Sequence, residues 1–101
     1  MVYKIAPEPR VLHYLKKLKD RELKKRFLDI IYESIAEDPY LGEKKHGNLS
    51  EFYVWAFHYA KTDYRVAYII LKDKVVPIIL AGSHENFYET LSRVDIGKID
   101  D

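Results

Sequence analysis

Apolar residues in the first third of the chain recur at the spacing of two amphipathic helices. Steps of three and four residues place side chains on one helix face. The first stripe consists of Val11, Leu12, Leu15 and Leu18. The second stripe follows Asp20, a residue type that caps helix N-termini, and consists of Leu23, Phe27, Ile30, Ile31 and Ile35. It ends at Pro39, which cannot continue a helix, and Gly42 supplies a turn.

The remainder of the chain favours strands. Residues 2–6 alternate weakly and predict a short strand, whereas 43–50 are polar and predict a loop. Three apolar or aromatic runs then follow at 51–60, 64–72 and 74–82, separated by gaps short enough for hairpins. Pro77 indicates a free edge or a bulge in the last run, because proline donates no ladder hydrogen bond. Residues 85–94 can form a final short helix.

This order of elements predicts an α+β fold with the pattern β-α-α-β-β-β and a possible C-terminal helix. Two successive helices followed by a meander give two layers, with the helices on one face of a small, mostly antiparallel sheet. The other face can be open to a partner or a substrate. At 101 residues the chain is expected to form one domain over 1–101.

Composition narrows the class of protein. Hydrophobic residues make up 48% and charged residues 33%, which is typical of a soluble globular protein. No apolar run approaches the ~20 residues that span a bilayer, and the N-terminus lacks the apolar segment of a signal peptide. There is no cysteine for a disulfide or a thiolate metal site. We therefore expect a cytoplasmic protein that has no membrane partner.

Charge is unevenly distributed although the net charge is only +1. The segment 8–28 holds eight basic side chains against three acidic ones. A local basic surface can attract polyanions, but the solvated faces of two helices explain the same residues, and charge alone favours that explanation.

The candidate chemistry gathers at one predicted edge of the sheet. His58 and His84 lie at the C-terminal ends of two strands that run parallel to each other, and Asp63 and Arg65 lie at the start of the strand between them. Histidine transfers protons near neutral pH, and arginine stabilises negative charge on a phosphorus-centred transition state. Asp63 can orient a histidine. A base can stack on an aromatic ring, and the candidates are Tyr64, Phe87 and Tyr88.

Structural roles remain open for the same residues. Arg65 can pair with a carboxylate, His84 can cap the final helix and Tyr88 can belong to the core. The histidines lack the i, i+4 spacing of zinc-binding helices, so we expect no metal site and no cofactor.

Three segments carry a resemblance to a known family: "DPYLGEKKHGNLSEFYVWAF", "TDYRVAYII" and "VVPIILAGSHENFY". In this order they resemble the RelE/ParE superfamily of type II toxin–antitoxin toxins, nearest the RelE/YafQ-type mRNA interferases. The resemblance covers almost the whole chain and implies a RelE-like fold. It also implies a cognate antitoxin that wraps the toxin, with a toxin–antitoxin hetero-oligomer as a possible assembly.

The resemblance further implies roles for single residues. Arg65 matches the arginine that stabilises the scissile phosphate in RelE-type toxins, and His58 lies where these carry a catalytic lysine. His84 matches the proton donor of the YafQ-type branch, and Tyr88 matches an aromatic that contributes there. The other histidine and aspartate positions of that branch fall close to His46, His58 and Asp63. Ala56 departs from the pattern, since RelE-type members have a second lysine there.

The implied activity is metal-independent cleavage of mRNA, through attack of the 2′-hydroxyl on the adjacent phosphate. In this scheme His84 protonates the leaving 5′-oxygen, Arg65 holds the phosphate, and His58 or Asp63 helps to deprotonate the 2′-hydroxyl. RelE-type members act on mRNA in the ribosome. The alternative is binding without catalysis: the ParE branch poisons DNA gyrase, and a toxin relic would bind only its antitoxin.

Overall fold

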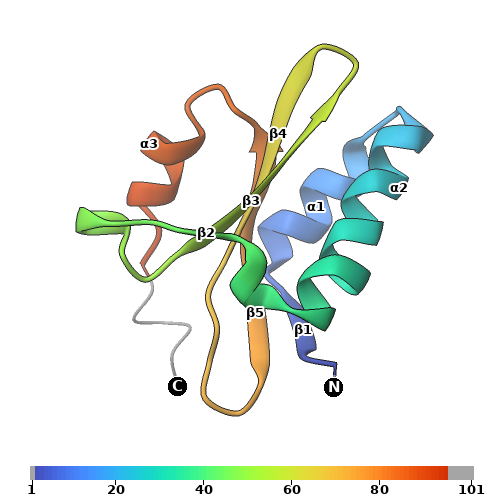
Figure 1. Ribbon diagram of the computed structural model, residues 1–101. Coiled ribbons are helices and arrows are strands. Elements are labelled where there is room, and N and C mark those ends of the chain that lie inside the picture. The colour runs from blue at the N-terminus through green and yellow to red at the C-terminus, as the bar shows by residue number, and fades with distance from the viewer. Residues whose placement is uncertain (1, 96–101) are drawn as a thin grey trace.

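A five-stranded sheet forms the centre of the molecule (Figure 1). The computed structural model describes residues 2–95. The strands are β1 (Lys4–Pro7), β2 (Glu43–Lys44), β3 (Tyr53–Tyr59), β4 (Thr62–Tyr68) and β5 (Val75–Ser83). Their order across the sheet is β1-β5-β4-β3-β2. Only the β1–β5 pair is parallel among the strand pairs of residues 2–95, which confirms the expected α+β fold with a mostly antiparallel sheet.

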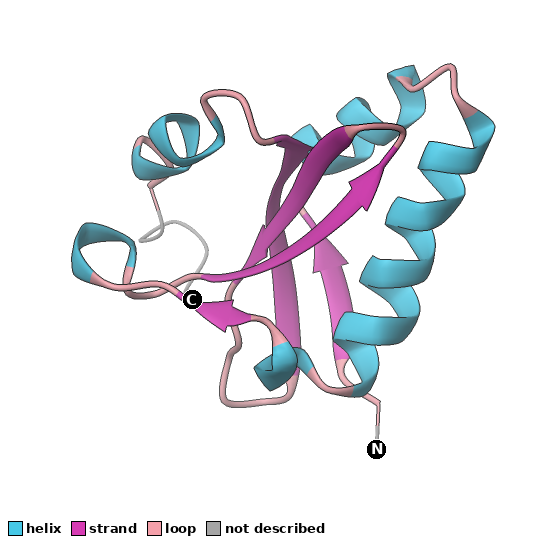
Figure 2. Cartoon of the chain, turned by 45° about the horizontal axis from the view of Figure 1, so that its top comes forward, coloured by secondary structure: helices cyan, strands magenta, loops and turns pink. Residues whose placement is uncertain are grey.

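Helices lie on both faces of this sheet (Figure 2). The α-helices of the described chain are α1 (Pro9–Lys17), α2 (Arg21–Asp29) and α3 (Phe87–Ser92). A π-helical segment, Ile30–Ile35, continues α2, and 3₁₀ turns occupy Pro39–Leu41 and Gly47–Leu49. The pair α1 and α2 covers one face, and α3 lies on the opposite side of the sheet (Figure 1). None of the helices between residues 2 and 95 has both the length and the apolar character needed to cross a bilayer.

Asp20 begins α2 and also ties it to the sheet. As expected, its carboxylate accepts hydrogen bonds from the backbone N–H groups of Glu22 (3.0 Å) and Leu23 (3.2 Å). The Tyr59 hydroxyl, at the end of β3, donates to the same carboxylate at 3.0 Å. The N-terminus of α2 and the tip of the β3–β4 hairpin therefore share one side chain.

The main core lies between the sheet and the pair α1 and α2. Every apolar residue expected on the second helical stripe is buried. The Phe27 ring packs edge-on against Tyr14, Phe57 and Tyr64, with centroids 5.0–5.7 Å apart. The prediction for the first stripe is wrong at Leu12, which is 50% exposed. Only Val11 and Leu15, four residues apart on the short α1, turn fully toward the sheet.

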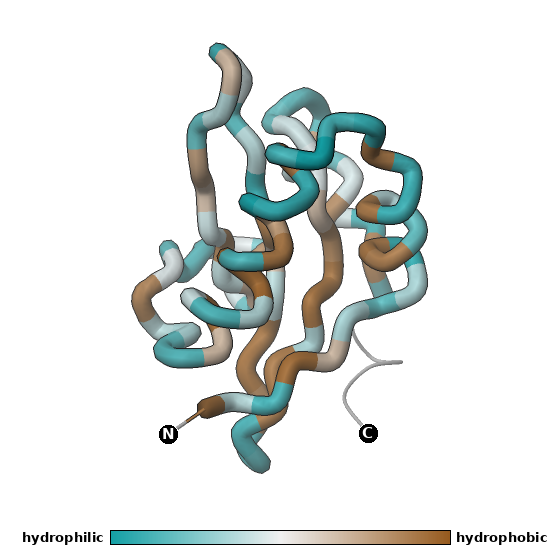
Figure 3. Tube along the Cα trace, turned by 90° about the vertical axis from the view of Figure 1, so that its right-hand side faces the viewer, coloured by the Kyte–Doolittle hydropathy of each residue, from teal (hydrophilic) through white to brown (hydrophobic). Residues whose placement is uncertain are grey.

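A second core lies on the other face, between the sheet and α3. It contains Phe52, Val54, Ile79, Phe87 and Leu91, all of them buried. Hydrophobic segments accordingly concentrate along the middle of the strands, while polar segments occupy the outer loops (Figure 3). The face opposite α1 and α2 is thus partly covered.

Two local expectations differ from the structure. The 43–50 segment is not wholly a loop, since β2 pairs Glu43 and Lys44 with Val54 and Tyr53; two residues are too few to show an alternating pattern. Pro77 lies in β5, which has neighbours on both sides, so it marks no free edge. The register between β4 and β5 does shift beside it, where Ala67 pairs with Leu80 and Tyr68 with Ile78. The single domain expected over 1–101 stays a prediction, because residues 1 and 96–101 lie outside the described part of the chain.

Gly42 leaves room for a buried tyrosine. Tyr68 is fully buried, and its hydroxyl donates to the Pro39 carbonyl at 2.6 Å. Burial raises the pKa of Tyr68, which keeps the hydroxyl protonated as a donor. A Cβ atom at Gly42 would overlap this hydroxyl and lie 3.3 Å from the Val54 carbonyl oxygen. The backbone there is ordinary, with φ −69°, so Gly42 is needed for space rather than for an unusual turn.

We expect Gly42→Ala to destabilise the protein by about 1–3 kcal/mol, the usual cost of overpacking a core. Urea unfolding measures this change. In a Tyr68→Phe background the hydroxyl is gone, so the same substitution should cost clearly less. An equal cost in both backgrounds would show that Tyr68 is not the obstacle.

Candidate active site

The β3–β4 hairpin positions the first two site residues. Ala60 and Lys61 form its two-residue turn, both with positive φ (49° and 67°), the conformation that matches the twist of paired strands. This turn sets His58 directly opposite Asp63. Both side chains lie on the α3 face, because Phe57 and Tyr64 beside them pack against α2 on the other face.

His58 and Asp63 form a hydrogen-bonded pair at the surface. His58 Nδ1 and Asp63 Oδ1 are 2.8 Å apart, with side chains 65% and 56% exposed. The hydrogen bond from His58 holds the pKa of the Asp63 carboxyl below its usual value, and the charges of His58, Arg65 and His84 act in the same direction. An ionised carboxylate only accepts hydrogen bonds, so Nδ1 carries the proton. In the neutral imidazole, Nε2 is then the nitrogen that can accept a proton.

The backbone of His84 is hydrogen-bonded to the backbone of Asp63. The His84 N–H donates to the Asp63 carbonyl at 2.8 Å, and the His84 carbonyl accepts from the Phe87 N–H at 3.3 Å. The side chain of His84 is exposed, just beyond the end of β5. Asp63 therefore joins the two histidines, one through its carboxylate and the other through its main chain.

Arg65 lies two residues along β4, on the same face. Its partners on the neighbouring strands are Ala56 in β3, which has a small side chain, and Gly82 in β5, which has none. The guanidinium carbon lies 5.4 Å from the centre of the Tyr88 ring on α3. Within residues 2–95, no carboxylate is at ion-pair distance from Arg65. The expected group of His58, Asp63, Arg65 and His84 thus lies around one end of the sheet, with Tyr88 beside it.

Lys45 contacts this group although the sequence did not single it out. Its ammonium lies 4.8 Å from the centre of the same Tyr88 ring. It also pairs with Glu43 at 3.4 Å, and its side chain is only 20% exposed. The two adjacent lysines, Lys44 and Lys45, were the only sequence signal for a basic group here. Because residues 43–50 were predicted to be a loop, the sequence could not show which lysine faces the site.

Two of the expected aromatic residues pack against the cores. Phe87 is 3% exposed in the core beneath α3, which corrects the expectation that its ring meets RNA. The Tyr64 ring packs on Phe27 and Phe57, both at 5.6 Å, on the face opposite Arg65. Tyr64 is half-buried there, and its contact with RNA stays a prediction. His46 is exposed just before the 3₁₀ turn at Gly47–Leu49, and its contact with RNA stays a prediction.

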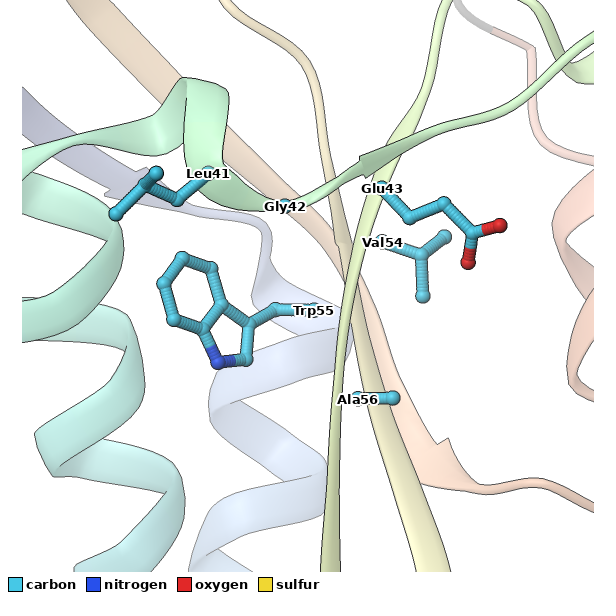
Figure 4. A pocket seen from close by; sticks show the side chains of 6 residues that line it. All are labelled: Leu41, Gly42, Glu43, Val54, Trp55 and Ala56. Atoms are coloured by element: carbon cyan, nitrogen blue, oxygen red, sulfur yellow. The ribbon is translucent and has the colours of Figure 1, made fainter.

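A shallow hollow lies elsewhere, at the β2 edge of the sheet (Figure 4). It is lined by Leu41, Gly42, Glu43, Val54, Trp55 and Ala56. Leu41 and Trp55 extend toward α2, whereas Glu43 and Val54 lie on the other side of the edge (Figure 4). None of the expected catalytic residues lines it. In the described part of the chain, no three histidine, aspartate or glutamate side chains are grouped to hold a metal ion.

Comparison with known proteins identifies relatives by sequence pattern. A family model described as the ParE-like toxin of type II bacterial toxin–antitoxin systems matches residues 5–92. A search among curated proteins found no significant match.

Solved structures with the same fold include RelE proteins. The free-state RelE toxin of E. coli, as a double arginine-to-alanine mutant, is 20% identical with a TM-score of 0.71, covering 91% of this chain and 94% of that chain. The Mycobacterium tuberculosis RelBE2 toxin–antitoxin complex is 16% identical, with a TM-score of 0.68 and coverage of 83% and 93%. The intact E. coli RelBE toxin–antitoxin complex is 21% identical, with a TM-score of 0.64 and coverage of 82% and 98%. These likenesses confirm the expected RelE-like fold.

We expect the pKa of Asp63, followed by NMR of its carboxyl carbon, to lie below the usual aspartate value and to rise in His58→Ala. A lowered folded-state pKa adds stability above the unfolded-state pKa. That contribution is lost as the pH falls through the folded-state pKa of Asp63, so the effect of His58→Ala on stability should disappear in acid. An unchanged Asp63 pKa in His58→Ala would show that this hydrogen bond does not form in solution.

Proposed function

The chain belongs to the ParE-like toxins of type II bacterial toxin–antitoxin systems. Within that family, we propose that it is an endoribonuclease that cleaves mRNA on the ribosome. One observation carries the proposal: two histidines, an aspartate and an arginine meet at one exposed end of the sheet. These side chains include the proton acceptor, proton donor and anion-stabilising group that RNA cleavage requires.

In the proposed reaction, His58 is the general base. Asp63 holds Nδ1–H, so Nε2 accepts the proton of the 2′-hydroxyl, as in other imidazole–carboxylate pairs. The 2′-oxygen then forms a bond to the adjacent phosphorus. The sequence left either His58 or Asp63 as the base. In this proposal His58 is the base, and Asp63 orients its imidazole ring.

His84 is the proposed general acid. In its protonated form it gives a proton to the 5′-oxygen as the bond from phosphorus to that oxygen breaks. The products are a 2′,3′-cyclic phosphate and a 5′-hydroxyl. Arg65, which has no carboxylate partner in residues 2–95, stabilises the charge that develops on the phosphate oxygens. Side chains supply both proton transfers, so this step requires no metal ion.

The exposure of the site supports a polymeric substrate. The His58 and Asp63 side chains are more than half exposed, and His84 is exposed as well. A surface of this kind gives little enclosure to a small molecule. The ribosome would position the mRNA strand against it.

We also propose a cognate antitoxin as the partner that controls the toxin. The similar RelBE and RelBE2 proteins were solved as toxin–antitoxin complexes. A hetero-oligomer with the antitoxin is therefore the expected resting form.

We expect His84→Ala to abolish cleavage, because the leaving oxygen loses its proton donor. Mapping of mRNA 5′ ends after a brief pulse of expression measures this. His13→Ala is the matched control, since His13 is exposed on α1, across the sheet from the site. Cuts inside translated frames should persist with the control and vanish with His84→Ala.

Two results would contradict the proposal in different ways. Equal cleavage by wild type and His84→Ala would remove His84 from the mechanism. Arrested growth with intact mRNA would favour the alternative, a gyrase poison of the ParE type, and DNA damage on expression would identify it. Normal growth with antitoxin binding would indicate a toxin relic.

We expect Asp63→Asn to lower the cleavage rate by orders of magnitude while leaving the fold intact. The asparagine amide can donate to Nδ1, which would move the proton to Nε2 and abolish the base. Single-turnover cleavage on programmed ribosomes, followed against pH, measures the loss. A rate within a few fold of wild type would show that the imidazole needs no carboxylate.

A further inference from the structure

We propose that Lys45 and Arg65, arranged around the Tyr88 ring, form a two-cation site for RNA phosphates, in which Lys45 binds a second phosphodiester beside the one held by Arg65. This inference rests on the proposed function, because it assigns the way in which RNA lies on the same surface. The ligand is the phosphodiester backbone, so the site carries no base preference of its own.

The geometry brings two cations to one ring. The Lys45 ammonium is 4.8 Å and the Arg65 guanidinium 5.4 Å from the centre of Tyr88, both within the range of cation–π attraction. The cations therefore lie no further apart than the sum of these two distances. They come from different elements, since Arg65 is in β4, Lys45 follows β2 and Tyr88 is in α3.

The charge around the ring favours an anion. Two positive groups approach each other within about the 8–10 Å over which salt screens exposed charges. Lys45 pairs with Glu43, which is 73% exposed, and Asp63, two residues before Arg65, is hydrogen-bonded to His58. Glu89, which follows Tyr88, pairs with Arg93. The Glu43 side of the Lys45–Glu43 ion pair is open to solvent, so a phosphate can approach Lys45 and take the place of the Glu43 carboxylate.

Tyr88 acts as a positioning residue in this arrangement. Its ring is in contact with both cations and also meets the Phe87 ring edge-on at 5.6 Å. Of the two roles open to Tyr88, support of the site and stacking on a base, these contacts favour support. A long lysine side chain held against a ring loses less conformational freedom when it binds its ligand.

Lys44 provides an unusual internal control. It has the same charge and is the next residue, but it points to the opposite face of the sheet. Its ammonium lies 5.1 Å from the centre of the Tyr53 ring and donates to the Ser50 carbonyl at 2.9 Å. Lys44→Ala and Lys45→Ala therefore change the net charge equally but remove a cation from opposite faces of the sheet.

The test measures binding without cleavage. The probe is a single-stranded oligoribonucleotide in which every 2′-hydroxyl is methylated, so the nucleophile is blocked. Its affinity for the full chain is measured by fluorescence anisotropy at several salt concentrations. We expect Lys45→Ala to weaken binding about tenfold and to reduce the salt slope by about 0.7, because one phosphate of the single strand is then no longer neutralised by the protein. Lys44→Ala should leave both quantities close to the wild-type values.

Further variants separate charge from fold. Lys45→Arg keeps the cation and should restore most of the affinity. Tyr88→Phe keeps the ring and should bind like wild type, whereas Tyr88→Leu should weaken binding at unchanged thermal stability. Equal effects of Lys44→Ala and Lys45→Ala would overturn the proposal, and so would a wild-type protein that does not bind the probe. Probe binding that depends on Lys45, with no cleavage of unmodified mRNA on ribosomes, would support the phosphate site while contradicting the proposed nuclease.

Discussion

The two-residue alternation of β4 is the constraint on which both the core and the candidate site depend. Tyr64, Val66 and Tyr68 face α1 and α2 and are packed there, while Asp63 and Arg65 face the side of α3. A slip of one residue in the register would exchange the two sets, moving two charges into the core beneath α1 and α2 and three apolar side chains to the face of α3. Burial of Val66 and Tyr68 therefore holds Asp63 opposite His58 as firmly as any contact within the site does.

Local signals in the sequence predicted most of the fold. Pairings between distant segments could not be predicted from such signals. The cap at Asp20, the stripe from Leu23 to Ile35 and the β3-β4-β5 meander all arise from neighbours in sequence. The parallel pairing of β1 with β5 has no such signal, because nothing near residues 4–7 specifies a partner 71 residues away. The two-residue strand β2 was missed because alternation cannot be recognised over so short a segment.

The candidate site was predictable where strand order alone determines it. A meander necessarily brings the ends of β3 and β5 beside the start of β4, so His58, Asp63, Arg65 and His84 could be grouped from the order of the strands. Side-chain direction beyond the strands could not be predicted. Phe87 and Tyr88 are adjacent in sequence, yet one is buried and the other contacts two cations, because the rotation of α3 against the sheet decides between them. Lys45 was missed for a related reason, since its partner ring belongs to α3.

The parallel β1–β5 pair also determines when the protein can become complete during its own synthesis. Residues 4–7 leave the ribosome before β5, the strand against which they pair, has been made. Until β5 is available, β4 lacks one of its two neighbours and β1 lacks its only one among the strands of residues 2–95. His84 and Tyr88 follow β5 and are later still. A polypeptide that ends before Tyr88 therefore cannot carry the whole site, however well its earlier strands have paired.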